Sequence, residues 1–133
     1  MIKKIFFIVL TLAICIPIAE AKKKTAKKAV FPVSVTELKT ERMVNPMSID
    51  TPTPRLGWII TSQKNDVLQT SCRIIVASTE EKAQALDGDL WDTTINGSKS
   101  QWISYAGKTL KSNTRCYWRV KVNTTQGSSD WSD

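Results

Sequence analysis

The stretch from Cys116 to Asp133 most constrains what this chain can fold into. Within it, Trp118, Val120 and Val122 alternate with more polar residues. This two-residue period is typical of a strand with one apolar face and one solvated face. The pattern therefore predicts a strand over Tyr117–Asn123.

A turn and the beginning of a further strand follow. Gln126–Ser129 is rich in turn-forming residues, and Asp130–Ser132 then predicts a strand that pairs back on its predecessor. Because the chain stops at Asp133, we expect this last strand to be incomplete and the domain to be truncated at its C-terminus. An incomplete last strand leaves an unpaired edge on Tyr117–Asn123, which is an aggregation hazard.

The rest of the body divides into short apolar segments separated by turn-forming residues. They predict strands, the first of them at a sheet edge, over Val33–Met43, Leu56–Ile60, Thr70–Ala77, Leu90–Ile95 and Ser100–Tyr105. The last two flank Asn96-Gly97, the dipeptide favoured by type I′ turns, so we expect them to form a hairpin.

One helix is expected, over Thr79–Leu86, with Thr79 as its N-cap and acidic residues in its first turn. A doubly wound α/β fold needs a helix between successive strands, and this chain offers one helix in all. The strand pattern instead predicts an all-β fold, an antiparallel β-sandwich over residues 33–133.

Residues 1–21 have the three parts of a signal peptide. Lys3 and Lys4 form a positive start, Ile5–Ile18 is apolar, and Ala19–Ala21 is an A-x-A cleavage site. The fourteen apolar residues are too few to span a bilayer as a helix, so no stable transmembrane anchor is expected. We expect export to the periplasm or the extracellular space, with lipoprotein anchoring at Cys15 as the less favoured alternative.

The positive charge is concentrated in the N-terminal tail. Seven of the nineteen basic residues lie in the first 28 positions, and residues 22–32 form a lysine-rich linker. From Ala29 onward, twelve basic residues are balanced by eleven acidic ones. A nucleic-acid-binding domain carries its basic residues on the folded surface. No nucleic-acid partner is therefore expected.

The sequence contains no histidine, which removes imidazole metal ligands and histidine general bases. Asp87, Asp89 and Asp92 are close together, but Trp91 and Asp92 occupy the fifth and sixth positions from Asp87, where an EF-hand loop needs a ligand and a glycine. We expect a solvated turn there, with no metal and no cofactor.

Five tryptophans invite comparison with a sugar-stacking platform. Trp58 and Trp118 lie on the apolar faces of their strands, so we expect them in the core. Trp102, flanked by Gln101 and Ser104, is the candidate for a carbohydrate contact.

Taken together, these segments resemble the N-terminal fibronectin type III-like module of bacterial α-L-rhamnosidases. The resemblance covers about Val33 to Asp133 and rests on an ordered set of motifs: Asn45-Pro46 with Asp50, Pro54–Trp58, Gln69–Ser78, Gly88–Asp92, Tyr105–Leu110, Tyr117–Val120 and Gly127–Ser132. It implies an immunoglobulin-like sandwich attached to an exported glycoside hydrolase that removes terminal α-L-rhamnose from glycans or glycosides.

The family's catalytic carboxylates lie in a downstream (α/α)₆ barrel, and no position here matches them. No catalytic residue is therefore assigned, and this chain alone is expected to be inactive. The implied partners are the rest of the parent enzyme, its barrel and β-domains, together with a rhamnose-containing glycan. The alternative is a free-standing exported β-sandwich that binds glycan or protein.

The chain departs from the family at Cys72 and Cys116, where aromatic residues are usual. In a fibronectin-like strand order, these cysteines begin two neighbouring antiparallel strands. Six residues of offset place them about 20 Å apart at ~3.3 Å per residue, whereas a disulfide needs Cα atoms within about 7 Å. We expect two separate buried thiols.

Overall fold

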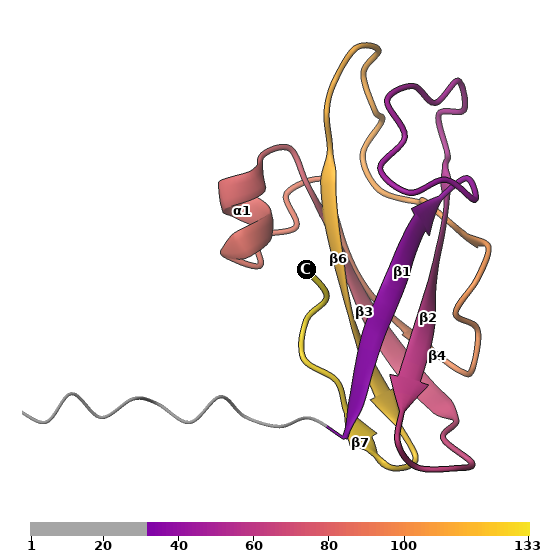
Figure 1. Ribbon diagram of the computed structural model, residues 1–133. Helices are drawn as coiled ribbons and strands as arrows, with labels where there is room; N and C mark the ends of the chain where they lie inside the picture. The colour runs from indigo at the N-terminus through magenta and orange to yellow at the C-terminus, as the bar shows by residue number, and fades with distance from the viewer. Residues whose placement is uncertain (1–31) are drawn as a thin grey trace, which may run out of the picture.

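The structure is a computed structural model that describes residues 32–133. In this part of the chain, seven strands form two antiparallel sheets packed face to face, and a short helix lies outside them (Figure 1). The all-β antiparallel sandwich expected from the sequence is confirmed. The signal peptide at 1–21 with Cys15, and the linker at 22–32 up to residue 31, lie outside the described residues.

The smaller sheet has three strands in the order β1-β2-β5, with β1 at Val33–Thr40, β2 at Arg55–Ser62 and β5 at Ile103–Ser104. The first strand is at an edge, as expected. Its register with β2 shifts between Thr36 and Lys39, which marks a β-bulge.

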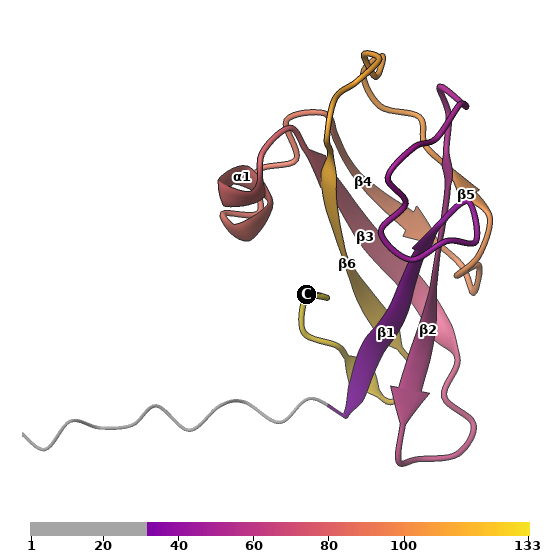
Figure 2. The same cartoon turned by 45° about the horizontal axis from the view of Figure 1, so that its top comes forward.

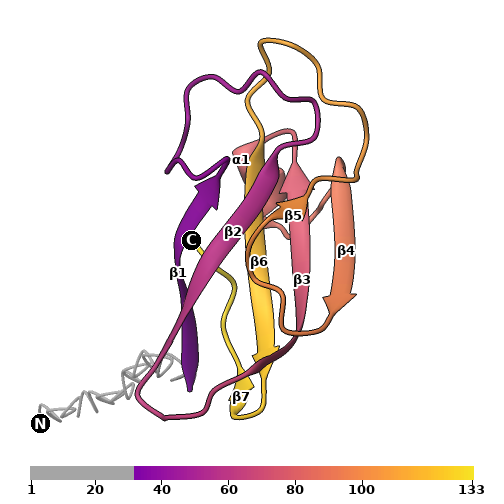
Figure 3. The same ribbon diagram turned by 90° about the vertical axis from the view of Figure 1, so that its right-hand side faces the viewer.

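The larger sheet has the order β4-β3-β6-β7, with β4 at Trp91–Asn96, β3 at Gln69–Ala77, β6 at Tyr117–Thr124 and β7 at Gly127–Ser128. β3 pairs on both sides, with β4 and with β6. β1 is at the edge of the smaller sheet and β4 is at the edge of the larger one, and they lie on opposite sides of the molecule (Figure 3).

The core lies between the sheets and consists mainly of side chains that point inward from alternate positions of the strands. Its buried members are Val33, Leu56, Trp58, Cys72, Ile74, Val76, Ile103, Tyr105, Val120 and Val122. The two-residue apolar periods in β2, β3 and β6 are thus the direct cause of this packing.

The outer face of β3 is also covered, which the alternation did not predict. Ile75 and Ala77 are completely buried because α1 (Glu80–Gln84) packs on this side of the sheet (Figure 1). The helix is shorter than expected. Its predicted N-cap is confirmed: the Thr79 hydroxyl accepts a hydrogen bond from the Lys82 amide at 3.3 Å.

The predicted hairpin at Asn96-Gly97 is wrong. β4 pairs with β3, whereas β5 pairs with β2 in the other sheet, so the chain after Asn96 crosses between the sheets (Figure 2). The buried Gln69 side chain holds this crossover by donating to the carbonyl oxygens of Gly97 at 3.3 Å and Lys99 at 2.8 Å. These tertiary hydrogen bonds outweigh the local turn preference.

The strand predicted at Asp130–Ser132 does not form, but the C-terminal segment still lies along β6. After β7 it forms no regular strand, but the Ser129 and Ser132 amides donate to the carbonyl oxygens of Val122 and Val120, each at 2.9 Å. In return the Val122 and Val120 amides donate to the two serine hydroxyls, each at 3.0 Å. The expectation of an unpaired edge on β6 is therefore wrong at Val120 and Val122, because the amide and carbonyl groups of both residues are hydrogen-bonded to this segment.

Candidate functional site

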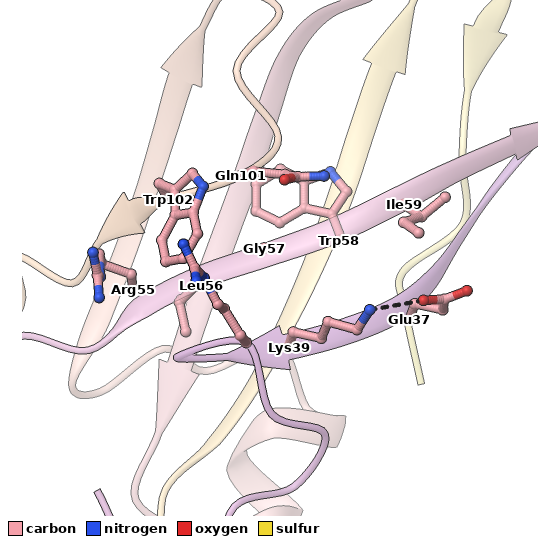
Figure 4. A pocket seen from close by; sticks show the side chains of 10 residues that line it. Glu37, Lys39, Arg55, Leu56, Gly57, Trp58, Ile59, Gln101 and Trp102 are labelled. Carbon is pink, nitrogen blue, oxygen red and sulfur yellow. Dashed lines mark hydrogen bonds and ion pairs between the residues drawn. The ribbon is translucent and has the colours of Figure 1, made fainter. Parts of the chain in front are cut away.

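A groove of about 370 Å³ lies on the outer face of the three-stranded sheet (Figure 4). Its lining comes from β1, the loop after it, β2 and the segment before β5: Glu37, Lys39, Arg42, Arg55, Leu56, Gly57, Trp58, Ile59, Gln101 and Trp102. In β2, Leu56 and Trp58 point inward and are buried, so the outward Arg55, Gly57 and Ile59 form the floor.

The carbohydrate-contact candidate Trp102 lies in this groove and is half-buried. Its backbone has a φ of 60°, in the left-handed region that aromatic residues rarely occupy. The preceding residues are fixed to β2, because the Trp58 amide donates to the Ser100 carbonyl oxygen at 3.1 Å. The crossover and β2 together set the position of the indole.

Two arginines lie over the Trp102 ring. The guanidinium carbon of Arg42 is 4.3 Å from the ring centroid, and that of Arg55 is 4.5 Å away. Both distances are well inside the range of a cation–π interaction. The indole is therefore the centre of a cationic cluster rather than an isolated aromatic side chain.

Glu41 neutralises one of these arginines. Its carboxylate accepts hydrogen bonds from Arg55 Nε at 3.1 Å, Arg55 Nη2 at 2.7 Å and the Arg55 amide at 2.6 Å. The hydrogen bonds from the Arg55 side chain hold the pKa of Glu41 below its ordinary value. A general acid for glycoside hydrolysis needs the opposite shift, so Glu41 is unsuited to that role.

Lys39 and Glu37 form a second ion pair in the groove, with Lys39 Nζ 2.9 Å from Glu37 Oε2 (Figure 4). The side chains are 40% and 56% exposed, so solvent screens the pair and it contributes little to stability. After the β-bulge, Lys39 lies opposite Gly57, which is part of the groove floor. Both carboxylates at the groove are thus engaged by cations.

Unusual backbone conformations gather around this groove. Glu37, Glu41, Arg42 and Trp102 all have positive φ values, of 49°, 50°, 69° and 60°. Such conformations cost of order 1–3 kcal/mol each and persist where the surrounding structure enforces them. Clusters of this kind are frequent at binding sites, which makes this groove the candidate site.

Sequence reasoning missed Glu41, Arg42 and Arg55. They lie far from Trp102 in the sequence, and only the pairing of β2 with β1 and with β5 brings them together. The signal present in the sequence was Pro54–Trp58, one of the motifs of the resemblance, which includes Arg55.

The other tryptophans have structural positions. Trp58 is 2% exposed, which confirms the expectation that it is in the core. Trp118 is half-buried and packs against that core, with its ring centroid 6.4 Å from that of Trp58. Trp91 contacts Tyr105 edge-on at 5.2 Å, and Trp131 lies beneath the Arg73 guanidinium at 5.6 Å.

Two of the clustered aspartates are held in ion pairs. The Asp89 carboxylate accepts from Lys82 Nζ at 2.8 Å and from the amide and hydroxyl of Ser78, and these hydrogen bonds hold its pKa far below the ordinary value. Asp92 accepts from two nitrogens of Arg73, at 2.9 and 2.8 Å. Asp89 thus links α1, which contains Lys82, to the residue that follows β3, and Asp92 links β4 to β3.

Residues 32–133 contain no group of three or more histidine, cysteine, aspartate or glutamate side chains arranged to hold a metal ion. Over the same range, none of the helices has the length and apolar character needed to cross a membrane.

Cys72 and Cys116 are both free thiols, as expected. Cys72 lies opposite Val122 on β6, six positions along the chain from Cys116, which confirms the predicted offset. Cys72 is completely buried, and burial raises the pKa of its thiol to about 11. Cys116 is only half-buried, so the expectation of two buried thiols is correct for Cys72 alone.

The two antiparallel sheets of residues 32–133, packed face to face, define an immunoglobulin-like β-sandwich module. The family of Rha78A-like N-terminal immunoglobulin domains matches residues 35–133. The chain belongs to this family.

Curated relatives named α-L-rhamnosidase share this module. One from Formosa agariphila is 36% identical over 91 residues, or 67% of this chain, and one from Streptomyces avermitilis is 33% identical over 100 residues, or 74%. The matched region spans about 10% of the length of each of these relatives.

Solved structures give the same picture. The α-L-rhamnosidase from Dictyoglumus thermophilum superposes with a TM-score of 0.72 and 29% identity, covering 75% of this chain and 11% of that one. The Streptomyces avermitilis α-L-rhamnosidase complexed with L-rhamnose has a TM-score of 0.70 and 31% identity, covering 75% and 10%. The chain thus corresponds to a small part of these larger enzymes.

Proposed function

We propose that this chain is the non-catalytic N-terminal accessory module of an exported α-L-rhamnosidase. The observation that carries the proposal is the family match over residues 35–133, combined with coverage of only about a tenth of relatives named for that activity. Hydrolysis of terminal α-L-rhamnose is then assigned to a catalytic (α/α)₆ barrel outside this chain.

The site chemistry supports a non-catalytic role. Glycoside hydrolysis uses two carboxyl groups, one with a raised pKa as general acid. At the groove, Glu37 is paired with Lys39, and Glu41 is paired with Arg55 with a lowered pKa. Neither glutamate is arranged for acid catalysis.

The proposed role is packing and spacing within the parent enzyme. The loop after β1 carries exposed apolar side chains, with Met43 at 47%, Val44 at 63% and Met47 fully exposed. Exposed apolar side chains that lie together are typical of surfaces covered by a partner. We propose that this loop packs against the barrel or the β-domains of the parent enzyme.

Export is part of the same proposal. Residues 1–21 are proposed to direct secretion to the periplasm or the extracellular space, with cleavage after Ala21. Mass spectrometry of the exported product tests this: a mature N-terminus at Lys22 is expected, whereas a lipid-modified N-terminus at Cys15 would instead indicate a lipoprotein.

The second candidate function is a free-standing exported sandwich that binds glycan, and the groove around Trp102 favours it. Trp102 is the proposed carbohydrate contact, including contact with rhamnose-containing glycan. Loss of glycan affinity in Trp102→Ala, with an unchanged circular dichroism spectrum, supports this contact. Unchanged affinity removes it.

The coding sequence downstream of Asp133 separates the two functions. A reading frame that continues into a segment with the helical pattern of an (α/α)₆ barrel supports the accessory module. A stop codon directly after Asp133 in the native gene supports the free-standing binder.

A further inference from the structure

We propose that the groove around Trp102 binds the carboxylate of an acidic saccharide through the guanidinium group of Arg42. The inference rests on the proposed carbohydrate contact at Trp102 and adds the charge of the sugar and the residue that recognises it.

The groove has an unequal number of positive and negative groups. Lys39 is paired with Glu37, and Arg55 is paired with Glu41. Among residues 32–133, the Arg42 side chain forms no salt bridge and donates no hydrogen bond to a side chain or backbone oxygen. Arg42 therefore leaves one unmatched positive charge at this site.

The Arg42 guanidinium is nevertheless held in place. It lies 4.3 Å from the Trp102 ring centroid, and Arg55, the other cation on that ring, is fixed by three hydrogen bonds from its Nε and Nη2 to the Glu41 carboxylate. The positive φ values of Arg42 and Trp102 show that both backbones are constrained by their surroundings. A guanidinium group ordered before binding loses less conformational entropy when it meets an anion.

A guanidinium group is suited to one ligand chemistry above all. Its planar fork donates two parallel hydrogen bonds to a carboxylate, and such charge-assisted bonds are about twice as strong as neutral ones. The Arg42 guanidinium carbon lies 4.3 Å from the indole centroid, and the residue is exposed, so a carboxylate from solvent can reach its N–H groups beside the ring.

The size and lining of the groove favour a sugar as the carrier of that carboxylate. Its volume of about 370 Å³ falls at the lower end of small-ligand sites, which begin at roughly 300 Å³. The exposed Gln101 amide offers both a donor and an acceptor for hydroxyl groups, and Ile59, 38% exposed, offers an apolar floor. A uronic acid unit combines hydroxyls, an apolar ring face and a carboxylate.

The test is a titration of the full chain with digalacturonate, followed by NMR of the tryptophan indole N–H signals and by calorimetry. Saturable binding is expected, with a shift of the Trp102 signal and weaker affinity at higher salt. Arg42→Asn should weaken binding roughly tenfold or more, because it removes a hydrogen-bonded ion pair. Asparagine also tolerates the left-handed backbone at this position.

Arg115→Gln is the matched control. It removes the same charge from an exposed arginine outside the groove and should leave the affinity within about twofold, as expected for a distant screened charge. Thermal unfolding of both variants confirms that they are folded. Equal losses in the two variants would overturn the inference, since they would reflect net charge alone.

Two further ligands separate the inference from the proposed function. Equal affinity for neutral rhamnose and digalacturonate overturns the inference while leaving the sugar contact in place. Binding of neither sugar overturns the sugar contact as well. Stronger binding of poly-L-glutamate than of digalacturonate, lost in Arg42→Asn, also overturns the inference, because the groove would then accept an acidic peptide.

Discussion

The indole N–H of Trp58 donates a hydrogen bond to the side-chain oxygen of Gln69 at 3.2 Å, and both residues are buried. The Gln69 amide nitrogen in turn donates to the Gly97 and Lys99 carbonyl oxygens. One side chain thereby connects β2, β3 and the crossover that leads to Trp102. The candidate site consequently depends on a polar group within the core.

Gln69→Ala should lower the free energy of unfolding by about 1–3 kcal/mol, the cost of leaving a buried donor or acceptor without a partner. Urea unfolding measures this change. Gln63→Ala, at an exposed position, should have little effect. Equal unfolding midpoints for the two variants would contradict this role of Gln69.

The serine contacts along β6 give a second prediction. Ser129→Ala and Ser132→Ala each remove a buried hydroxyl that accepts from a β6 amide, so each should cost about 1–3 kcal/mol. The double variant should also aggregate on heating, because it leaves strand-edge amides unpaired. Light scattering during thermal unfolding measures this. Ser112→Ala, at an exposed loop position, is the control, and matching scattering curves for it and the double variant would refute the idea.

Gly107 packs so closely against Leu90, Trp91 and Tyr105 that there is no room for a side chain at this position. A Cβ at this position would lie 2.4 Å from the Leu90 carbonyl oxygen, 2.5 Å from the Tyr105 hydroxyl and 2.6 Å from the Trp91 Cβ. Gly107→Ala should therefore cost roughly 1–3 kcal/mol in thermal or urea unfolding, as for other overpacked sites. Gly57→Ala is the comparison, since its Cβ would meet its nearest atom at an ordinary 3.6 Å. Equal tolerance of both substitutions would show that the segment around Gly107 is free to shift.

The buried Cys72 thiol predicts a loss of stability at alkaline pH. Burial raises its pKa from 9.0 to about 11, so in this range the unfolded state gives up a proton that the folded state retains. The unfolding free energy should therefore fall as the pH rises from about 9 to 11, with no contribution from this group at lower pH. Urea midpoints across this range should fall less steeply in Cys72→Ala, and parallel curves would exclude the thiol as the cause.

The sheets were largely predictable because their burial follows a simple period. Leu56, Trp58, Ile74, Val120 and Val122 all occupy the inward positions that alternation assigned to them. The helix cap at Thr79 was also predictable, since a threonine hydroxyl satisfies an amide within one turn. The sequence pattern therefore predicted the structure correctly where contacts between residues close in the sequence determine it.

The errors occurred where contacts between distant residues decide the structure. Asn96-Gly97 carries a strong hairpin signal, yet the side chain of Gln69, 28 residues earlier, binds the Gly97 and Lys99 carbonyl oxygens and holds the segment that crosses to the other sheet. The burial of Ile75 depends on α1 packing over an outward face.

The candidate site shows the same limit. Trp102 was singled out from its neighbours, but its two arginines come from the loop after β1 and from the start of β2. No pattern in either segment alone indicates that they converge on one indole ring.

The most direct test of the central claim is a rhamnosidase assay of the purified 133-residue chain on an aryl α-L-rhamnoside, with an active α-L-rhamnosidase as positive control. Release of the aryl group should remain at the rate of the protein-free blank at every protein concentration. This is the result predicted for an accessory module in which the two glutamates at the groove, Glu37 and Glu41, are held in ion pairs. A rate that rises in proportion to the concentration of this chain would contradict the claim.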